Sequence, residues 1–177
     1  GGMTMTHDAL LWMEEGSRIR CFLCPHHCWI GDGKYGLCSV RTNQAGRLKT
    51  ENYGEITSMA VDPVEKKPLY HFKPGKRILS VGSFGAILPV NSAKIIPLPN
   101  SGGKLPPEQL AASSGSPTGN IGIAFTYNEP SVWFEYVYDT ARKLKELDPD
   151  RKAVLVTNGY IGPEALDMLL PFIDAMN

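Results

Sequence analysis

Residues 120–147 read NIGIAFTYNEPSVWFEYVYDTARKLKEL, and this stretch decides the fold class. Residues 120–126 form an apolar run with the length of a buried β-strand. Pro130 then opens a segment, residues 131–147, whose apolar side chains recur at the spacing of one helix face. The stretch therefore predicts a buried strand that leads directly into an amphipathic helix.

The same order of elements recurs on both sides of this unit. Residues 77–84 and 153–157 are apolar runs that fit strands, and residues 163–170 begin with proline and fit a helix. Residues 173–176 fit the start of a further strand. Strands that alternate with helices favour a parallel sheet of β/α units. About three such units do not close a barrel, so we expect an α/β fold that is an incomplete (β/α) barrel.

The region that precedes these units has a different character. Residues 3–72 contain all 4 cysteines and many turn-forming residues, so we expect a small, loop-rich four-cysteine module there. Within it, residues 8–15 carry apolar side chains at the spacing of a short amphipathic helix, and residues 55–61 fit a strand.

The expected β/α domain covers residues 76–177 and is interrupted by one segment. Residues 86–118 are rich in proline and glycine, which predicts an irregular stretch that no continuous helix can span. Residues 107–112, within that stretch, resemble the start of a helix.

Composition restricts the class of partner. The formal net charge is +0 and the pI is about 7.1, so there is no electrostatic argument for a nucleic-acid or membrane-surface partner. No apolar run reaches the roughly 18 residues that span a bilayer. The cysteines are tightly clustered and no export signal precedes them, so we expect a cytoplasmic protein with reduced thiols.

The cysteine cluster is the strongest chemical signal in the chain. Cys21, Cys24, Cys28 and Cys38 have the spacing C-x2-C-x3-C-x9-C. Four thiolates form a complete tetrahedral ligand set for zinc, and also suit an iron–sulfur cluster. The alternatives are buried thiols that pack as small apolar groups and a redox-active pair at the first two positions. Clustering favours metal, with zinc as the first choice, but the spacing does not separate zinc from iron–sulfur.

Several segments together resemble radical-SAM enzymes of the glycyl-radical-activating type, which include pyruvate formate-lyase activating-enzyme-like and AmmeMemoRadiSam-system proteins. The resemblance is carried by CFLCPHHC at 21–28, GLCSVR at 36–41, residues 62–72, ILSVG at 78–82, residues 120–130, VTNGY at 156–160 and DAMN at 174–177. It implies a radical-SAM barrel in which a 4Fe–4S cluster binds S-adenosylmethionine and cleaves it reductively to a 5′-deoxyadenosyl radical. It also implies an oxidoreductase whose substrate is a glycyl radical enzyme or a small molecule.

The cluster loop of this family follows the first barrel strand and supplies three cysteines. Here residues 85–96 read GAILPVNSAKII and contain no cysteine, so no soft ligand is available for the cluster. We therefore expect the chain as written to be catalytically incompetent. A base lost from the gene before this loop and one gained near Pro106 would explain the difference, since the neighbouring frame can encode cysteines at Ala86, Val90 and about Ala93. The alternative is a natural, divergent loop.

Two strand ends supply the remaining site candidates. By resemblance, Asn128 and Glu129 take the place of the motif that binds the amino group of S-adenosylmethionine, and Thr157 and Asn158 occupy the equivalent position one strand later. Helix capping is the alternative for the first pair, and a simple turn for the second. The sequence thus supports two functions, namely a radical-SAM protein without an active cluster and a non-catalytic, zinc-binding structural or interaction module.

Overall fold

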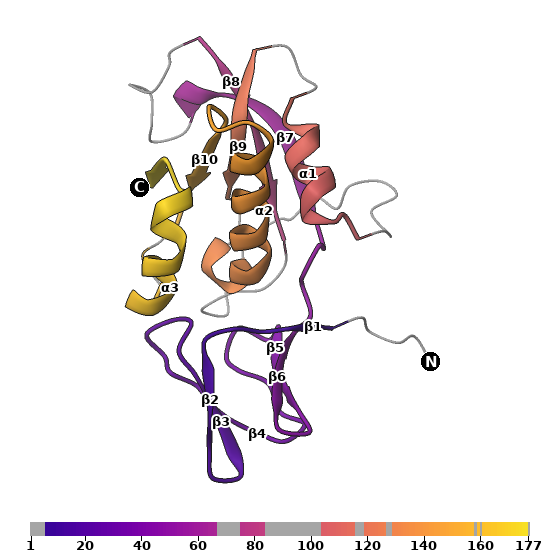
Figure 1. The fold of residues 1–177 in the computed structure, drawn as a ribbon. Coiled ribbons are helices and arrows are strands. Elements are labelled where there is room, and N and C mark those ends of the chain that lie inside the picture. The colour runs from indigo at the N-terminus through magenta and orange to yellow at the C-terminus, as the bar shows by residue number, and fades with distance from the viewer. Residues whose placement is uncertain are drawn as a thin grey trace.

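The computed structural model describes residues 6–66, 75–83, 104–115, 119–126, 129–157, 159 and 161–176. The centre of the α/β domain is a sheet in the order β11-β10-β9-β8-β7 (Figure 1). Its strands are β7 (Ser58–Pro63), β8 (Arg77–Gly82), β9 (Asn120–Phe125), β10 (Lys152–Leu155) and β11 (Ala175–Met176). Strands β8 to β11 run parallel, whereas β7 pairs antiparallel with β8. The predicted α/β class and parallel strands are confirmed.

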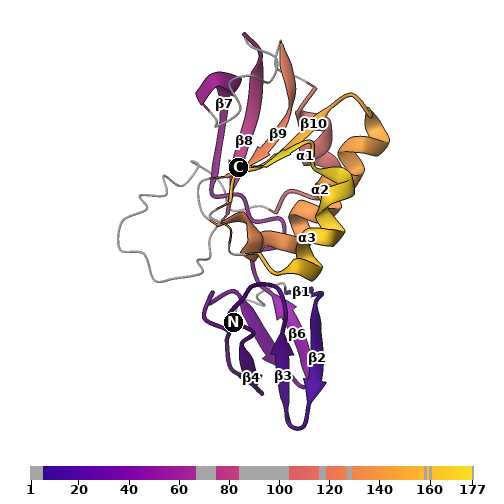
Figure 2. The same cartoon turned by 90° about the vertical axis from the view of Figure 1, so that its left-hand side faces the viewer.

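Helices of the described residues cover one face of this sheet, as Figures 1 and 2 both show. They are α1 (Pro107–Ser113), α2 (Phe134–Leu147) and α3 (Pro163–Leu169), with the 3-10 turns η2 (Pro130–Trp133) before α2 and η3 (Leu170–Phe172) after α3. The predicted helices at 131–147 and 163–170 are confirmed. No helix in the described part of the chain is long and apolar enough to cross a membrane.

Helix α1 confirms the helix start expected at 107–112 and limits the expected irregularity of residues 86–118. Residues 107–113 are helical, because Pro107 occupies a favoured first-turn position and Leu110 and Ala111 bury one face. The remainder of that segment, apart from residues 104–106, 114 and 115, lies outside the described residues.

Alternating residues of the strands divide the sheet into two apolar faces. Ile123 and Phe125 of β9 pack in the main core beneath the helices. Ala124 lies on the opposite face with Ile78 of β8 and Val154 of β10. A strand that is apolar on both faces reads as a continuous hydrophobic run, which is why these strands were recognisable from the sequence.

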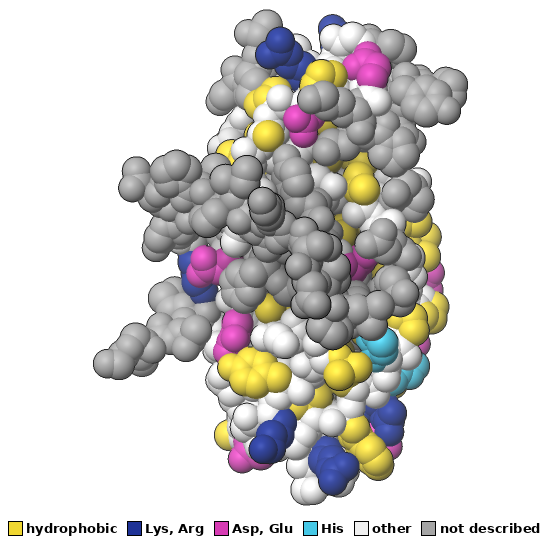
Figure 3. All heavy atoms as spheres, turned by 180° about the vertical axis from the view of Figure 1, so that it is seen from behind, with side chains coloured by type: hydrophobic (Ala, Val, Ile, Leu, Met, Phe, Trp, Pro, Cys, Tyr) yellow, Lys and Arg dark blue, Asp and Glu magenta, His cyan; other side chains and the backbone are white. Residues whose placement is uncertain are grey.

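The N-terminal module contains two small antiparallel sheets rather than mainly loops. One has the order β1-β6-β5 and the other β2-β3-β4. The strands are β1 (His7–Asp8), β2 (Trp12–Glu15), β3 (Arg18–Cys21), β4 (Trp29–Gly31), β5 (Arg41–Gln44) and β6 (Arg47–Thr50). The module lies next to the lower ends of α2 and α3 in Figure 1. On the described part of its surface in Figure 3, hydrophobic side chains are interspersed with charged and polar ones.

The predicted helix at 8–15 is wrong. Strand β2 pairs with β3 from Trp12–Cys21 to Glu15–Arg18, and Gly16 supplies the left-handed conformation (φ 66°) at the turn. Pairing with a neighbouring strand therefore overrides the weak helical spacing of the apolar side chains. The predicted strand at 55–61 begins instead at Ser58 and continues to Pro63, followed by a 3-10 turn, η1 (Val64–Lys66).

Gly122 is required where β9 and β10 approach each other. It pairs with Lys152, and an ideal Cβ at Gly122 would overlap the carbonyl group of that residue. Gly122→Ala should therefore destabilise the chain by about 3 kcal/mol, the upper end for overpacking, because backbone atoms cannot rotate away as a side chain can. Urea unfolding measures the change. Gly31→Ala in β4 is the matched control, since its Cβ would meet only Lys34 Cγ at 3.8 Å. Equal stability of the two variants would contradict this packing argument.

Candidate metal centre

The four cysteines line one cavity in the N-terminal module. Cys21 ends β3, Cys24 and Cys28 lie in the turn between β3 and β4, and Cys38 lies between β4 and β5. The cavity volume is about 20 Å³, and Arg41 and several apolar side chains complete its wall. This volume accommodates one water-sized particle.

The side chains do not yet converge on one point. Within the described residues, no group of three or more His, Cys, Asp or Glu side chains is gathered closely enough to count as a preformed metal site. All four cysteines are free thiols. The structure therefore shows four donors around one cavity, whereas their role as metal ligands stays a prediction.

Backbone N–H groups already point at two of the sulfurs. The amide of His26 donates to Cys24, and the amides of Val40 and Arg41 donate to Cys38. Burial raises the pKa of both thiols, while these amides partly offset the increase because they stabilise the thiolate. Each of these cysteines lies in a turn: the His27 amide donates to the Cys24 carbonyl at 3.2 Å, and the Ser39 amide donates to the Gly36 carbonyl at 3.0 Å.

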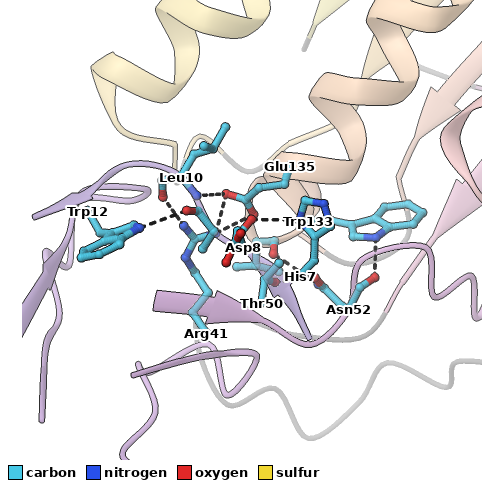
Figure 4. A network of polar contacts seen from close by, with 11 residues as sticks. His7, Asp8, Leu10, Trp12, Arg41, Thr50, Asn52, Trp133 and Glu135 are labelled. Atoms are coloured by element: carbon cyan, nitrogen blue, oxygen red, sulfur yellow. Dashed lines mark hydrogen bonds and ion pairs between the residues drawn. The ribbon is translucent and has the colours of Figure 1, made fainter. Parts of the chain in front are cut away.

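Arg41 connects the cavity to helix α2. Its side chain is buried, and Nη1 lies 2.7 Å and 3.0 Å from the two carboxylate oxygens of Glu135 (Figure 4). Nη2 donates to the carbonyl of Leu10, whose own amide donates to Glu135 Oε2 at 3.0 Å. Burial alone would lower the pKa of Arg41, but Glu135 and then Cys21 raise it above its usual value, so the guanidinium stays charged.

Three further hydrogen bonds join the module to the α/β domain. Trp133 Nε1 donates to the Asn52 carbonyl at 2.8 Å, and Asn52 Nδ2 donates to the Val132 carbonyl at 3.2 Å. Gly162, just before α3, donates its amide to the Leu23 carbonyl at 2.8 Å. A Cβ at Gly162 would lie 2.8 Å from the Phe22 carbonyl oxygen, so only glycine permits this approach. The cysteine loop is thus held directly against the start of α3.

Tyr53 makes this interface sensitive to alkaline pH. Its phenol donates to Asp139 of α2, and burial, followed by this hydrogen bond, raises its pKa well above the usual value. Because the pKa is higher in the folded state, the neutral phenol contributes its full stability below about pH 10 and loses it as the pH rises through the folded pKa. Thermal unfolding should show a loss of stability above about pH 10 that is smaller in Tyr53→Phe. An identical loss in that variant would exclude Tyr53 as the cause.

The strand-end candidates are partly described. Glu129 Oε1 accepts a hydrogen bond from the Thr157 hydroxyl and another from the Ser131 amide at 3.3 Å. The side chains of Glu129 and Thr157 are buried. Glu129 therefore caps η2, and Thr157 accepts the amide of Gly159 at 3.2 Å, as a turn residue does. The structure brings Glu129 and Thr157 together at the ends of β9 and β10. Asn128 and Asn158 lie outside the described residues, as do Ala86, Val90 and Ala93.

Comparison with known proteins gives one informative match. No protein-family profile matches the chain, and no solved structure matches it. An uncharacterized protein of Methanocaldococcus jannaschii is 34% identical over 173 residues, which cover 92% of this chain and 49% of that protein. The similarity therefore includes both the cysteine module and the α/β domain, and the chain spans about half the length of the curated relative it matches.

Proposed function

We propose that this chain is part of a radical-SAM-type β/α protein in which the four-cysteine module is a structural metal centre that takes zinc. The observation that carries the metal proposal is the placement of Cys21, Cys24, Cys28 and Cys38 around one small cavity, with backbone amides aimed at two of the sulfurs. Structural zinc sites use this complete set of four thiolates. The module would then position the segments that pack against α2 and α3.

The radical-SAM relationship is supported by the order and direction of the strands. Strands β8, β9, β10 and β11 follow one another in sequence and in space, all parallel, with helices on one face. Glu129 and Thr157 meet at the carboxyl ends of β9 and β10, where β/α barrels place their functional groups. In intact relatives, S-adenosylmethionine would bind at such an edge, on the iron of a 4Fe–4S cluster.

The residues of this chain do not fit that catalytic cluster. All 4 cysteines lie within residues 21–38, and the loop that should supply cluster ligands contains none. Alanine and valine cannot replace thiolate ligands. The chain as written therefore serves as a metal-stabilised scaffold and does not carry out radical chemistry.

Metal and sulfide analysis of the purified chain tests this proposal. We expect about one zinc per chain and no acid-labile sulfide, because four thiolates complete the ligand set of one zinc ion. After anaerobic incubation with iron, sulfide, reductant and S-adenosylmethionine, no 5′-deoxyadenosine should form. Labile sulfide, together with a brown chromophore that depends on the four cysteines, would show that the centre holds an iron–sulfur cluster and not zinc. Formation of 5′-deoxyadenosine would contradict the scaffold role.

A further inference from the structure

Arg41 has one donor that the protein itself does not satisfy. The residue is 1% exposed, and its two terminal nitrogens bind Glu135 and the Leu10 carbonyl. Within the described part of the chain, Nε of Arg41 is buried and has no hydrogen-bond partner. A buried, charged donor without an acceptor costs free energy, so such an atom indicates that a partner is still to be supplied.

The cavity is the source of that partner. Arg41 forms part of its wall, and the electrostatic influence of Cys21 and Cys38 reaches the guanidinium. Four thiolates around one divalent ion carry a net charge of about −2, which a buried cation would partly neutralise. Glu135 binds the guanidinium through Nη1, and this contact fixes the orientation of the group. With thiolates bound to a metal in the cavity, Arg41 would stand between two negatively charged partners from different parts of the fold.

We propose that Arg41 is a positioning residue that couples the metal centre to helix α2. Its Nε–H donates to a metal-bound thiolate of Cys21 or Cys38, while its terminal nitrogens hold Glu135 and the Leu10 carbonyl. This inference rests on the proposed metal centre. Coupling between two sites is reciprocal, so metal binding strengthens the contact between the module and α2, and that contact strengthens metal binding.

Zinc affinity of the full chain, measured by competition with a chromogenic chelator, tests the first half of the coupling. Arg41→Lys keeps the positive charge for Glu135 but removes Nε–H, and it should weaken zinc binding about 10–100-fold, as expected for a group that supports a metal ligand. Arg20→Lys is the matched control. Arg20 binds Glu15 through its own Nε at 2.6 Å, in the same module, and that pair is partly accessible to solvent. The zinc affinity of Arg20→Lys should equal that of the wild type.

Amide hydrogen exchange tests whether metal binding strengthens the contact between the module and α2. The Leu10 amide donates to Glu135 Oε2, so its exchange rate reports the contact between the module and α2. Removing zinc from the wild type should speed this exchange, and Glu135→Gln should speed it even with zinc bound. Circular dichroism verifies that each variant is folded. Glu135→Gln conserves the size of the side chain, so it serves as a second variant beside Arg41→Lys.

The outcomes separate this inference from the proposed metal centre. Wild-type zinc affinity in Arg41→Lys, or a Leu10 exchange rate that does not respond to zinc, would overturn the coupling while leaving the metal centre in place. A wild-type chain that binds no zinc at all would overturn the metal centre itself, and the role of Arg41 with it. The coupling is supported if Arg41→Lys binds zinc more weakly while Arg20→Lys does not, and if exchange of the Leu10 amide depends on zinc.

Discussion

Removal of zinc is expected to lower the free energy of unfolding of the chain by about 4 kcal/mol or more. A ligand present at about 1,000 times its dissociation constant stabilises the native state by about 4.1 kcal/mol. Structural zinc in small domains binds tightly enough to exceed this ratio of concentration to dissociation constant. If the proposed metal centre is correct, the module depends on the metal because its own core is small. Between residues 6 and 50, its buried apolar side chains are Ala9, Ile19, Cys21, Leu23, Ile30, Val40 and Leu48. Urea unfolding with and without a strong chelator measures the difference.

Cys38→Ser provides the control for this experiment. Serine occupies nearly the same volume but offers no thiolate, so the variant should have the low stability of the chelated wild type. Adding chelator to the variant should then cause no further change. If chelator left the unfolding midpoint of the wild type unmoved, the cysteines would be packing groups and no structural metal would be involved.

Arg41→Met is expected to cost about 3–5 kcal/mol, because it leaves the carboxylate of Glu135 buried without its cation. Both members of this ion pair are almost completely inaccessible to water, so solvent cannot replace the lost partner. The change also removes the hydrogen bond to the Leu10 carbonyl. Urea unfolding in the presence of excess zinc measures the effect without a contribution from metal loss.

A double-mutant cycle isolates the ion pair from the other effects of the substitution. Arg41→Met combined with Glu135→Leu removes both buried charges, and the pair should be less destabilised than the sum of the single variants. Arg20→Met is the exposed counterpart and should cost only about 0–1 kcal/mol, as surface pairs do. Additive single effects at Arg41 and Glu135 would show that the two charges do not depend on each other.

Local patterns were sufficient to predict most of the α/β domain. Strands at 77–84, 120–126 and 153–157 were recognisable because both faces of each are apolar, and the helices because proline stands at their first positions. The segment 8–15 failed for a physical reason. Its apolar side chains fit a helical spacing, but hydrogen bonding to β3 determines its conformation, and a short window does not contain that partner.

In the candidate site, too, local sequence did not reveal partners that lie far apart in the chain. Spacing alone predicted that the four cysteines belong together, because they are close in the sequence. The partnership of Arg41 with Glu135 joins residues 94 positions apart and could not be read from either neighbourhood. One signal was available, since Glu135 is an acidic residue between the apolar Phe134 and Tyr136 in the first turn of a helix. A charge on a buried helix face requires a partner, although the sequence does not say which.

The sequential order of β8, β9, β10 and β11 has a consequence for biosynthesis. Each strand joins the sheet beside the one synthesised immediately before it, and antiparallel β7 already occupies the other side of β8. A nascent chain can therefore assemble the sheet from one side as it leaves the ribosome, without breaking any earlier pairing. The cysteine module emerges before these strands, so the proposed metal centre could form before the strands it supports have been translated.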